Sequence, residues 1–237
     1  MLRLMDFGWS DTFGPALGST AIFVAIHVVV ITRVEPVYGR AFKLSRGGAA
    51  LILTILGAAA LIGSLEHWRE AFLYRHPEGD WMRTGLLVVY GHLLADFIWM
   101  AVGKLKYGIT PRKDLLIHHG LGVLGFGAAL ALGIGYACGL LTMIAELLPL
   151  TTAVNAWGKR IAAVRVTQAA DRARLHVIAW LRLPLWIGLL VLVVLATFEG
   201  DVDGMFLAYL LAGGGLIGLI SLDVYWMGKC RERVDFY

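Results

Sequence analysis

The sequence has little charge and almost no cysteine, and both shortages narrow the class of protein. Charged residues make up 16% of the 237 residues and hydrophobic residues 59%, and the mean hydropathy is +0.74. This composition excludes an ordinary soluble domain and is typical of a chain with several membrane spans. The two cysteines, Cys138 and Cys230, give no sign of a disulfide framework.

No long polar stretch interrupts the chain, so we expect one domain over residues 1–237. The pI is near 9.2, but the cations lie in short segments between apolar runs. That placement favours membrane topology as their role and argues against a nucleic-acid partner. No A-x-A cleavage site follows the first apolar run, so we expect it to be a retained helix rather than a signal peptide.

Seven apolar runs follow one another, each close to the roughly 20 residues that cross about 30 Å of hydrocarbon. The fourth and fifth runs are separated only by Gly133-Ile134-Gly135, which predicts a tight helical hairpin. We therefore expect an all-α, polytopic membrane bundle of about seven transmembrane helices. The runs cover residues 16–32, 47–65, 84–103, 114–132, 135–154, 176–198 and 205–228.

Connections rich in cations alternate with connections poor in cations along the chain, which is the pattern that the positive-inside rule predicts. The second connection, Glu66 to Arg83, is mixed, the fourth has no charge, and the sixth is acidic at Glu199, Asp201 and Asp203. We therefore expect the N-terminus outside, the C-terminus in the cytoplasm, and a multi-pass protein of the plasma or bacterial inner membrane. The cations of the first, third and fifth connections and of the tail are Arg33, Arg40, Lys43 and Arg46; Lys104, Lys106, Arg112 and Lys113; Lys159, Arg160, Arg165, Arg172 and Arg174; and Lys229, Arg231 and Arg233.

Two adjacent histidines, His118 and His119, lie about one turn inside the fourth apolar run. Imidazole titrates near neutrality, so it can exchange protons or accept an acyl group. Adjacent helical residues point about 100° apart, so one ring can face a cavity while a neighbouring side chain holds the other. Ionisable residues in hydrocarbon cost free energy and are functional candidates by default.

Other titratable residues lie at a similar depth, in the half of each run next to the cationic segments. Counting 1.5 Å per residue places most of them about 6–12 Å from the helix ends. His92 is deeper and shares a helix face with Asp96 at i,i+4. This agreement predicts one intramembrane polar layer around the histidine pair, whose further members are Asp96, Glu146, Arg182, Asp223 and His27.

A structural role competes with a functional one for each of these groups. Asp96 and Arg182 also fit a buried ion pair that holds helices in register. His27 fits a packed or hydrogen-bonded core histidine better than a catalyst. Glu146 and Asp223 fit either a cap or pair near the interface or a place in the site.

Glycines and aromatic residues complete the pattern around the pair. The glycines fit either close helix packing or a channel for an acyl chain, and they are Gly120, Gly122, Gly125, Gly127, Gly133, Gly135 and Gly139. Aromatic residues near the run ends are expected to anchor the helices at the membrane interface, and they are Trp68, Trp81, Trp157, Tyr225 and Trp226.

The polar residues occur in an order that resembles the TLC domain. The segment has Asp96, then Lys113-Asp114-Leu115-Leu116-Ile117-His118-His119, then Glu146-Leu147-Leu148-Pro149 and Asn155. This superfamily contains the ceramide synthases and several smaller lipid-homeostasis proteins, and the resemblance covers about residues 90–160. The chain has no second acidic cluster after its histidines, so it resembles the smaller members more than the ceramide synthases proper.

The resemblance implies an acyltransferase that moves a fatty acyl group from acyl-CoA to a lipid amine or hydroxyl. In that reaction Asp96 would orient an imidazole, and His118 or His119 would be the general base or transient acyl acceptor. Acyl-CoA is the expected cosubstrate, membrane lipids are the expected partners, and a homodimer is left open. The expected substrate-binding residues are His92, Glu146, Asn155, Arg182, Asp223 and Lys113. Cations expected near the mouth of the site suit polyanionic coenzyme A, and they are Lys104, Lys106, Arg112, Lys113, Lys159 and Arg160.

Two other classes of function stay open. One is a metal-dependent lipid hydrolase or oxidase, but the sequence lacks the H-x-x-x-H and H-x-x-H-H spacings that put several ligands on one helix face, so no metal is expected. Its ligands would be His92, His118, His119, Asp96 and Glu146. The other is a non-catalytic protein of lipid binding or membrane-lipid homeostasis. A retinal protein is excluded because the seventh run has no mid-membrane lysine for a Schiff base.

Overall fold

Helices form nearly all of the computed structural model, which describes residues 9–66, 79–198 and 206–235 and has no strand among them. Seven helical stretches there are long and apolar enough to cross a membrane, which confirms the predicted all-α bundle. The elements are α1 (Trp9–Val29), η1 (Val30–Val34), α2 (Tyr38–Gly63), α4 (Gly79–Tyr107), α5 (Lys113–Leu132), α6 (Tyr136–Leu141), η2 (Thr142–Glu146), α7 (Leu147–Arg160), α8 (Val164–His176), η3 (Val177–Arg182), α9 (Leu183–Phe198) and α10 (Phe206–Val234).

The helices extend beyond the apolar runs at the cationic end of the bundle, so two predicted loops are much shorter than expected. The first connection is only residues 35–37, which places Arg40 and Arg46 inside α2. The fifth is residues 161–163, so the cations predicted in that loop lie at the end of α7 and in α8. The stretch Val164–Phe198 has 35 residues, which make about 52 Å of helix. The hydrocarbon of a membrane is about 30 Å thick. The excess is close to the length of α8. Residues 67–78 of the second connection, with Trp68, and the acidic sixth connection lie outside the described residues.

The predicted hairpin between the fourth and fifth spans is confirmed. Gly133 and Gly135 take left-handed φ angles of 71° and 68°, which glycine adopts without the steric cost of a Cβ. The amide of Gly133 donates to the carbonyl of Ala129 at 2.9 Å and so closes the last turn of α5.

Two prolines explain the irregular turns inside the later spans. Pro149 follows the 3-10 segment η2, and Pro184 follows the π segment η3. A proline donates no backbone hydrogen bond and crowds the carbonyl four residues earlier, so the preceding turn departs from α geometry. Both distortions occur beside the buried polar residues of these spans, Glu146 and Arg182.

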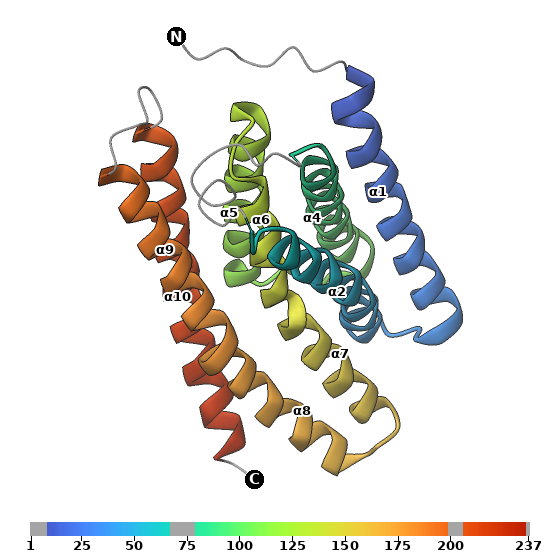
Figure 1. Cartoon of the computed structure of the whole chain (residues 1–237). Coiled ribbons are helices and arrows are strands. Elements are labelled where there is room, and N and C mark those ends of the chain that lie inside the picture. Colours follow the sequence, from blue (N-terminus) through green and yellow to red (C-terminus); the bar gives the residue numbers. More distant parts are fainter. Residues whose placement is uncertain (1–8, 67–78, 199–205, 236–237) are drawn as a thin grey trace.

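The main apolar core lies among α1, α2, α4 and α6, with Phe23, Leu53, Met82, Leu86 and Leu140 in contact. A second core joins α9 to α10, which lie side by side in Figure 1. Of the seven spans α4 is the most buried and α5 the least. Within α5, described over its whole length, His119 is the one fully buried side chain.

The short turn between α1 and α2 is fixed by a buried carboxylate. Glu35 is 1% exposed, accepts hydrogen bonds from Arg40 Nε at 2.9 Å and from the amide of Val37 at 2.9 Å, and has Arg160 Nε at 3.8 Å. The hydrogen bond from the Arg40 guanidinium is the main cause that lowers the pKa of Glu35 below its ordinary value. The turn is therefore tied electrostatically to the end of α7.

Candidate functional site

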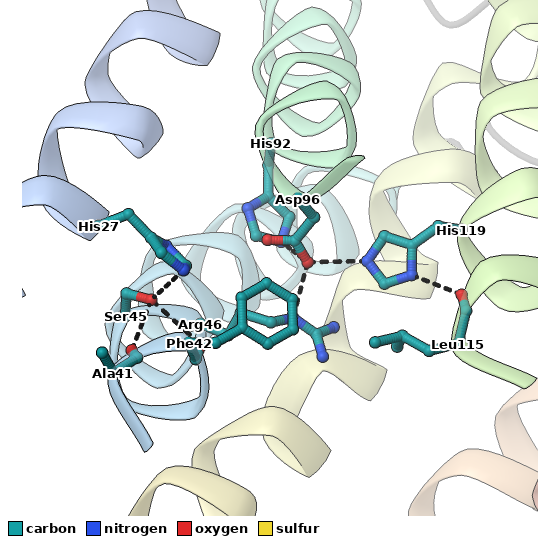
Figure 2. A network of polar contacts seen from close by, with 9 residues as sticks. All are labelled: His27, Ala41, Phe42, Ser45, Arg46, His92, Asp96, Leu115 and His119. Atoms are coloured by element: carbon teal, nitrogen blue, oxygen red, sulfur yellow. Dashed lines mark hydrogen bonds and ion pairs between the residues drawn. The ribbon is translucent and has the colours of Figure 1, made fainter. Parts of the chain in front are cut away.

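One carboxylate oxygen is the centre of the polar layer. Oδ2 of Asp96, on α4, lies 2.7 Å from Arg46 Nε, 2.8 Å from His119 Nε2 and 3.8 Å from His92 Nε2. Asp96 is 2% exposed. Figure 2 shows these groups reaching one another from α2, α4 and α5. The predicted layer therefore contains a real cluster of charged and titratable side chains.

Arg46 is the member of this cluster that sequence reasoning missed. It stands at the edge of an apolar run and was assigned to the first loop as a topogenic charge. Because α2 begins at Tyr38, Arg46 lies about 12 Å along the helix, at the depth predicted for Asp96. The alternative in which Asp96 pairs with Arg182 is therefore wrong, since Asp96 pairs with Arg46 instead. Counting depth from the helix start, rather than from the apolar run, would have revealed Arg46.

His119 uses both ring nitrogens for hydrogen bonds to oxygen acceptors. Its Nε2 lies 2.8 Å from Asp96 Oδ2, and its Nδ1 lies 2.9 Å from the carbonyl of Leu115. A carbonyl cannot donate, so Nδ1 of His119 donates to Leu115, and Nε2 is engaged with the Asp96 carboxylate. Both ring nitrogens of His119 therefore already have partners within the fold. His119 therefore holds α5 against α4.

His118 faces the other way, as the spacing of adjacent helical residues predicted. Its ring lies 5.4 Å from the Trp226 ring on α10 and 5.5 Å from the His119 ring. Its side chain is partly exposed, and its Nδ1 is buried without a hydrogen-bond partner among the described residues. Of the two histidines, His118 is therefore the one with an uncommitted nitrogen.

Trp226 connects the histidine pair to the start of α5. It is 5% exposed and donates from Nε1 to Asp114 Oδ2 at 2.6 Å. Its predicted role as an interface anchor is wrong, because α10 turns this side chain inward against α5. Trp81, Trp157 and Tyr225 are exposed, as interface anchors are.

Arg182 and Asp223 form a second buried pair, separate from Asp96. Arg182 Nε donates to Asp223 Oδ2 at 2.8 Å, and Trp186 Nε1 donates to the same oxygen at 2.7 Å. Arg182 Nη1 donates to the carbonyl of Ala145 at 3.0 Å. That carbonyl is the one whose α-helical donor is missing at Pro149. This geometry gives Arg182 a structural task, because it supplies a side-chain donor to a carbonyl that has lost its α-helical donor.

The other predicted site residues lie apart from the Asp96 cluster or bind within the fold. Asn155 Nδ2 donates to the carbonyl of Thr167 at 3.4 Å and links α7 to α8. Glu146 is buried at the end of η2, and Lys113 is exposed at the start of α5. His27 is hydrogen-bonded to Ser45 Oγ at 3.0 Å, which confirms the core-histidine interpretation.

The glycines after the histidine pair divide into two kinds. A Cβ at Gly122 would lie 3.0 Å from Leu93 and one at Gly139 would lie 2.9 Å from Leu86, as close packing requires, whereas a Cβ at Gly120 or Gly125 would meet nothing within 4 Å. The space beside Asp96, bounded by His27, Arg46 and His92, is too small for a water molecule. The larger cavity, of about 630 Å³, lies instead beyond Trp226, at the start of α5.

The donor set does not converge on a metal geometry. No group of three or more His, Cys, Asp or Glu side chains in the part of the chain that the structure describes could hold a metal ion. His92, His119 and Asp96 come nearest to one another, but the shared carboxylate oxygen already lies 2.7 Å from Arg46. No protein-family model, curated protein or solved structure matches the chain.

Proposed function

We propose that the protein is a membrane-embedded acyltransferase that uses acyl-CoA and a lipid amine or hydroxyl, with His118 as the reacting group. The observation that supports this choice is that the two histidines have different hydrogen-bond partners. Both ring nitrogens of His119 are hydrogen-bonded, to Leu115 and to Asp96, whereas Nδ1 of His118 has no hydrogen-bond partner among the described residues. A base held beside an oriented neighbour is the arrangement that general-base catalysis requires.

In the proposed step the acceptor nitrogen or oxygen attacks the thioester carbonyl, and its proton passes to His118. The new C–N or C–O bond forms as the C–S bond breaks. The proton on His118 then goes to the coenzyme A thiolate, which leaves as the thiol, so the imidazole is regenerated. The His119 ring lies 5.5 Å from the reacting ring, and Arg46 and Asp96 hold it in a fixed polar scaffold. Fixed charges of this kind need no reorganisation during the reaction.

The resemblance to the TLC domain supports the same proposal. It implies a contact between the intramembrane aspartate and the histidine pair, and Asp96 lies 2.8 Å from His119. This contact assigns Asp96 to His119 and leaves His118 for chemistry. Substrate-binding roles for His92, Glu146 and Asn155 remain predictions.

A non-catalytic lipid-binding protein is the second candidate. The observation that favours it is the closed packing around Asp96, where the space is too small for water. In this alternative the cluster only holds α2, α4 and α5 together, and His118 packs against Trp226. The two candidates differ in whether coenzyme A is released.

The test is the release of coenzyme A from palmitoyl-CoA by the detergent-purified protein, with a panel of lipid amines and hydroxyls and chromatographic detection. We expect release with at least one acceptor and a loss of more than 100-fold in His118→Ala. The matched control is His176→Ala, which removes an exposed histidine of α8. Full activity in a folded His118→Ala variant would overturn the assignment. No release over the panel by the folded wild type would leave the lipid-binding candidate.

A further inference from the structure

A cavity of about 630 Å³ opens where the start of α5 meets the ends of α8 and α10. This is the end of the bundle at which the C-terminus lies (Figure 1). The polar residues of its wall are Arg112, Lys113, Asp114, Arg174, Lys229 and Arg233. The Asp96 cluster contributes no residue to it, so the cavity is a separate feature of the fold.

The wall of this cavity is strongly cationic. Five of its side chains are Lys or Arg and one is acidic. The single carboxylate, Asp114, already binds the Arg112 guanidinium and accepts a hydrogen bond from Trp226. Like charges around one cavity repel each other, and an anion inside it would relieve that repulsion. Charge therefore predicts an anionic occupant.

Arg174, in the wall of this cavity, gives a second observation that indicates a ligand. Its Nε is buried and has no hydrogen-bond partner among the described residues. A buried guanidinium N–H without an acceptor costs free energy unless a ligand satisfies it. Guanidinium groups bind phosphate through paired hydrogen bonds. The geometry thus favours a phosphate oxygen over a simple counter-ion.

The remaining wall is apolar and leads to the histidine pair. It is formed by Ile117, Leu222, Tyr225 and Trp226 together with Cys230. Ile117 is 55% exposed and Tyr225 is 53% exposed, so this side opens toward the lipid-facing surface of α5 and α10. Trp226 separates the cavity from His118, and the two rings are 5.4 Å apart. A ligand with a charged head and an apolar tail matches both walls.

We propose that this cavity binds the phosphate-bearing head of an amphiphile, with the phosphate at Arg174 and the apolar part along Trp226. Two sources offer this chemistry, the phosphates of a coenzyme A thioester and the headgroup of an anionic phospholipid. The binding site does not rest on the acyl-transfer proposal, because none of its cations belongs to the histidine cluster. Occupancy by a coenzyme A thioester would place the acyl chain one indole ring away from His118.

The test measures binding without turnover, on the full chain in nanodiscs of phosphatidylcholine. Coenzyme A is titrated by calorimetry, and dioleoyl phosphatidic acid is compared with added phosphatidylcholine by native mass spectrometry. We expect one probe to bind with an affinity that falls as salt rises. Arg174→Gln should weaken it at least 10-fold, and so should Lys229→Gln, whose side chain is 53% exposed and tolerant of change.

The matched control is Arg165→Gln with Arg172→Gln, which removes exposed cations of α8 that do not line the cavity. His118→Ala should bind normally, which separates failure of this proposal from failure of acyl transfer. Preference for coenzyme A or for phosphatidic acid identifies the source of the phosphate. The proposal is overturned if neither probe binds more tightly than phosphatidylcholine, or if the control variant weakens binding as much as Arg174→Gln.

Discussion

Replacing Arg46 with methionine tests whether the Asp96 cluster stabilises the fold. The change removes the guanidinium 2.7 Å from a carboxylate that is 2% exposed. Removing one partner of a buried ion pair lowers the free energy of unfolding by about 3–5 kcal/mol, because the other charge is left buried without a counter-charge. Asp96 keeps its hydrogen bond from His119, so we expect the lower end, about 3 kcal/mol. For a chain of this size that is a fall in Tm of roughly 6–12 °C.

The assay is thermal unfolding followed by circular dichroism in detergent micelles, supported by titration with sodium dodecyl sulfate. The matched control is Lys43→Met, which removes an exposed cation from the same helix and should change Tm by no more than about 2 °C. The double variant Arg46→Met, Asp96→Asn removes both charges. We expect it to be at least about 1 kcal/mol more stable than Arg46→Met alone, because no uncompensated carboxylate remains.

Two results would refute this reasoning. One is an Arg46→Met variant as stable as the Lys43→Met control, which would mean that the carboxylate is satisfied without the guanidinium. The other is a double variant less stable than Arg46→Met, which would mean that Asp96 stabilises the fold mainly through other partners.

Three further predictions concern the other buried polar groups. His119→Ala should lower stability by about 1–3 kcal/mol, since it removes two buried hydrogen bonds, whereas His118→Ala should unfold like the wild type; equal losses would contradict the different roles of the two histidines. Arg182→Met should lower stability by about 3 kcal/mol or more, and adding Pro149→Ala should recover about 1 kcal/mol because an α-helical donor returns to the Ala145 carbonyl; no recovery would refute the link. Glu35 has a lowered pKa in the fold, so its contribution is present above its unfolded-state pKa and is lost as pH falls through the folded value. Glu35→Gln should therefore flatten the acid limb of Tm against pH, and an unchanged limb would argue against it.

The seven spans could be predicted because hydrophobic length is a local property of the sequence. Each apolar run overlaps one spanning helix over most of its length, and the Gly133-Ile134-Gly135 turn ends α5 as expected. The helix ends could not be read from hydropathy, because backbone hydrogen bonding continues into charged residues. For that reason α8, with its cations, appears as a loop in the sequence and as a helix in the structure.

The polar layer could be predicted by depth, but its pairings could not. Depth places Asp96, Arg182 and Asp223 at similar heights without saying which helices are neighbours. The structure pairs Asp96 with Arg46 and Arg182 with Asp223. The direction in which a helix turns its aromatic side chains also depends on tertiary packing, so Trp226 was assigned to the surface and lies buried. Depth along the helices therefore predicted which residues belong to the polar layer, but it did not predict which of them form pairs.

The hydrogen bond from Arg182 to the carbonyl of Ala145 has a consequence for the order in which the chain enters the membrane. The donor belongs to the sixth span and the acceptor to the fifth. Pro149 removes the α-helical donor that the fifth span would otherwise supply to this carbonyl, and the guanidinium of the sixth span supplies a side-chain donor there. During synthesis the contacts of the fifth span are therefore completed only when the sixth has been made. A chain ending after α7 should be retained by the insertion machinery or degraded, while one that extends past Arg182 should leave it as a stable bundle.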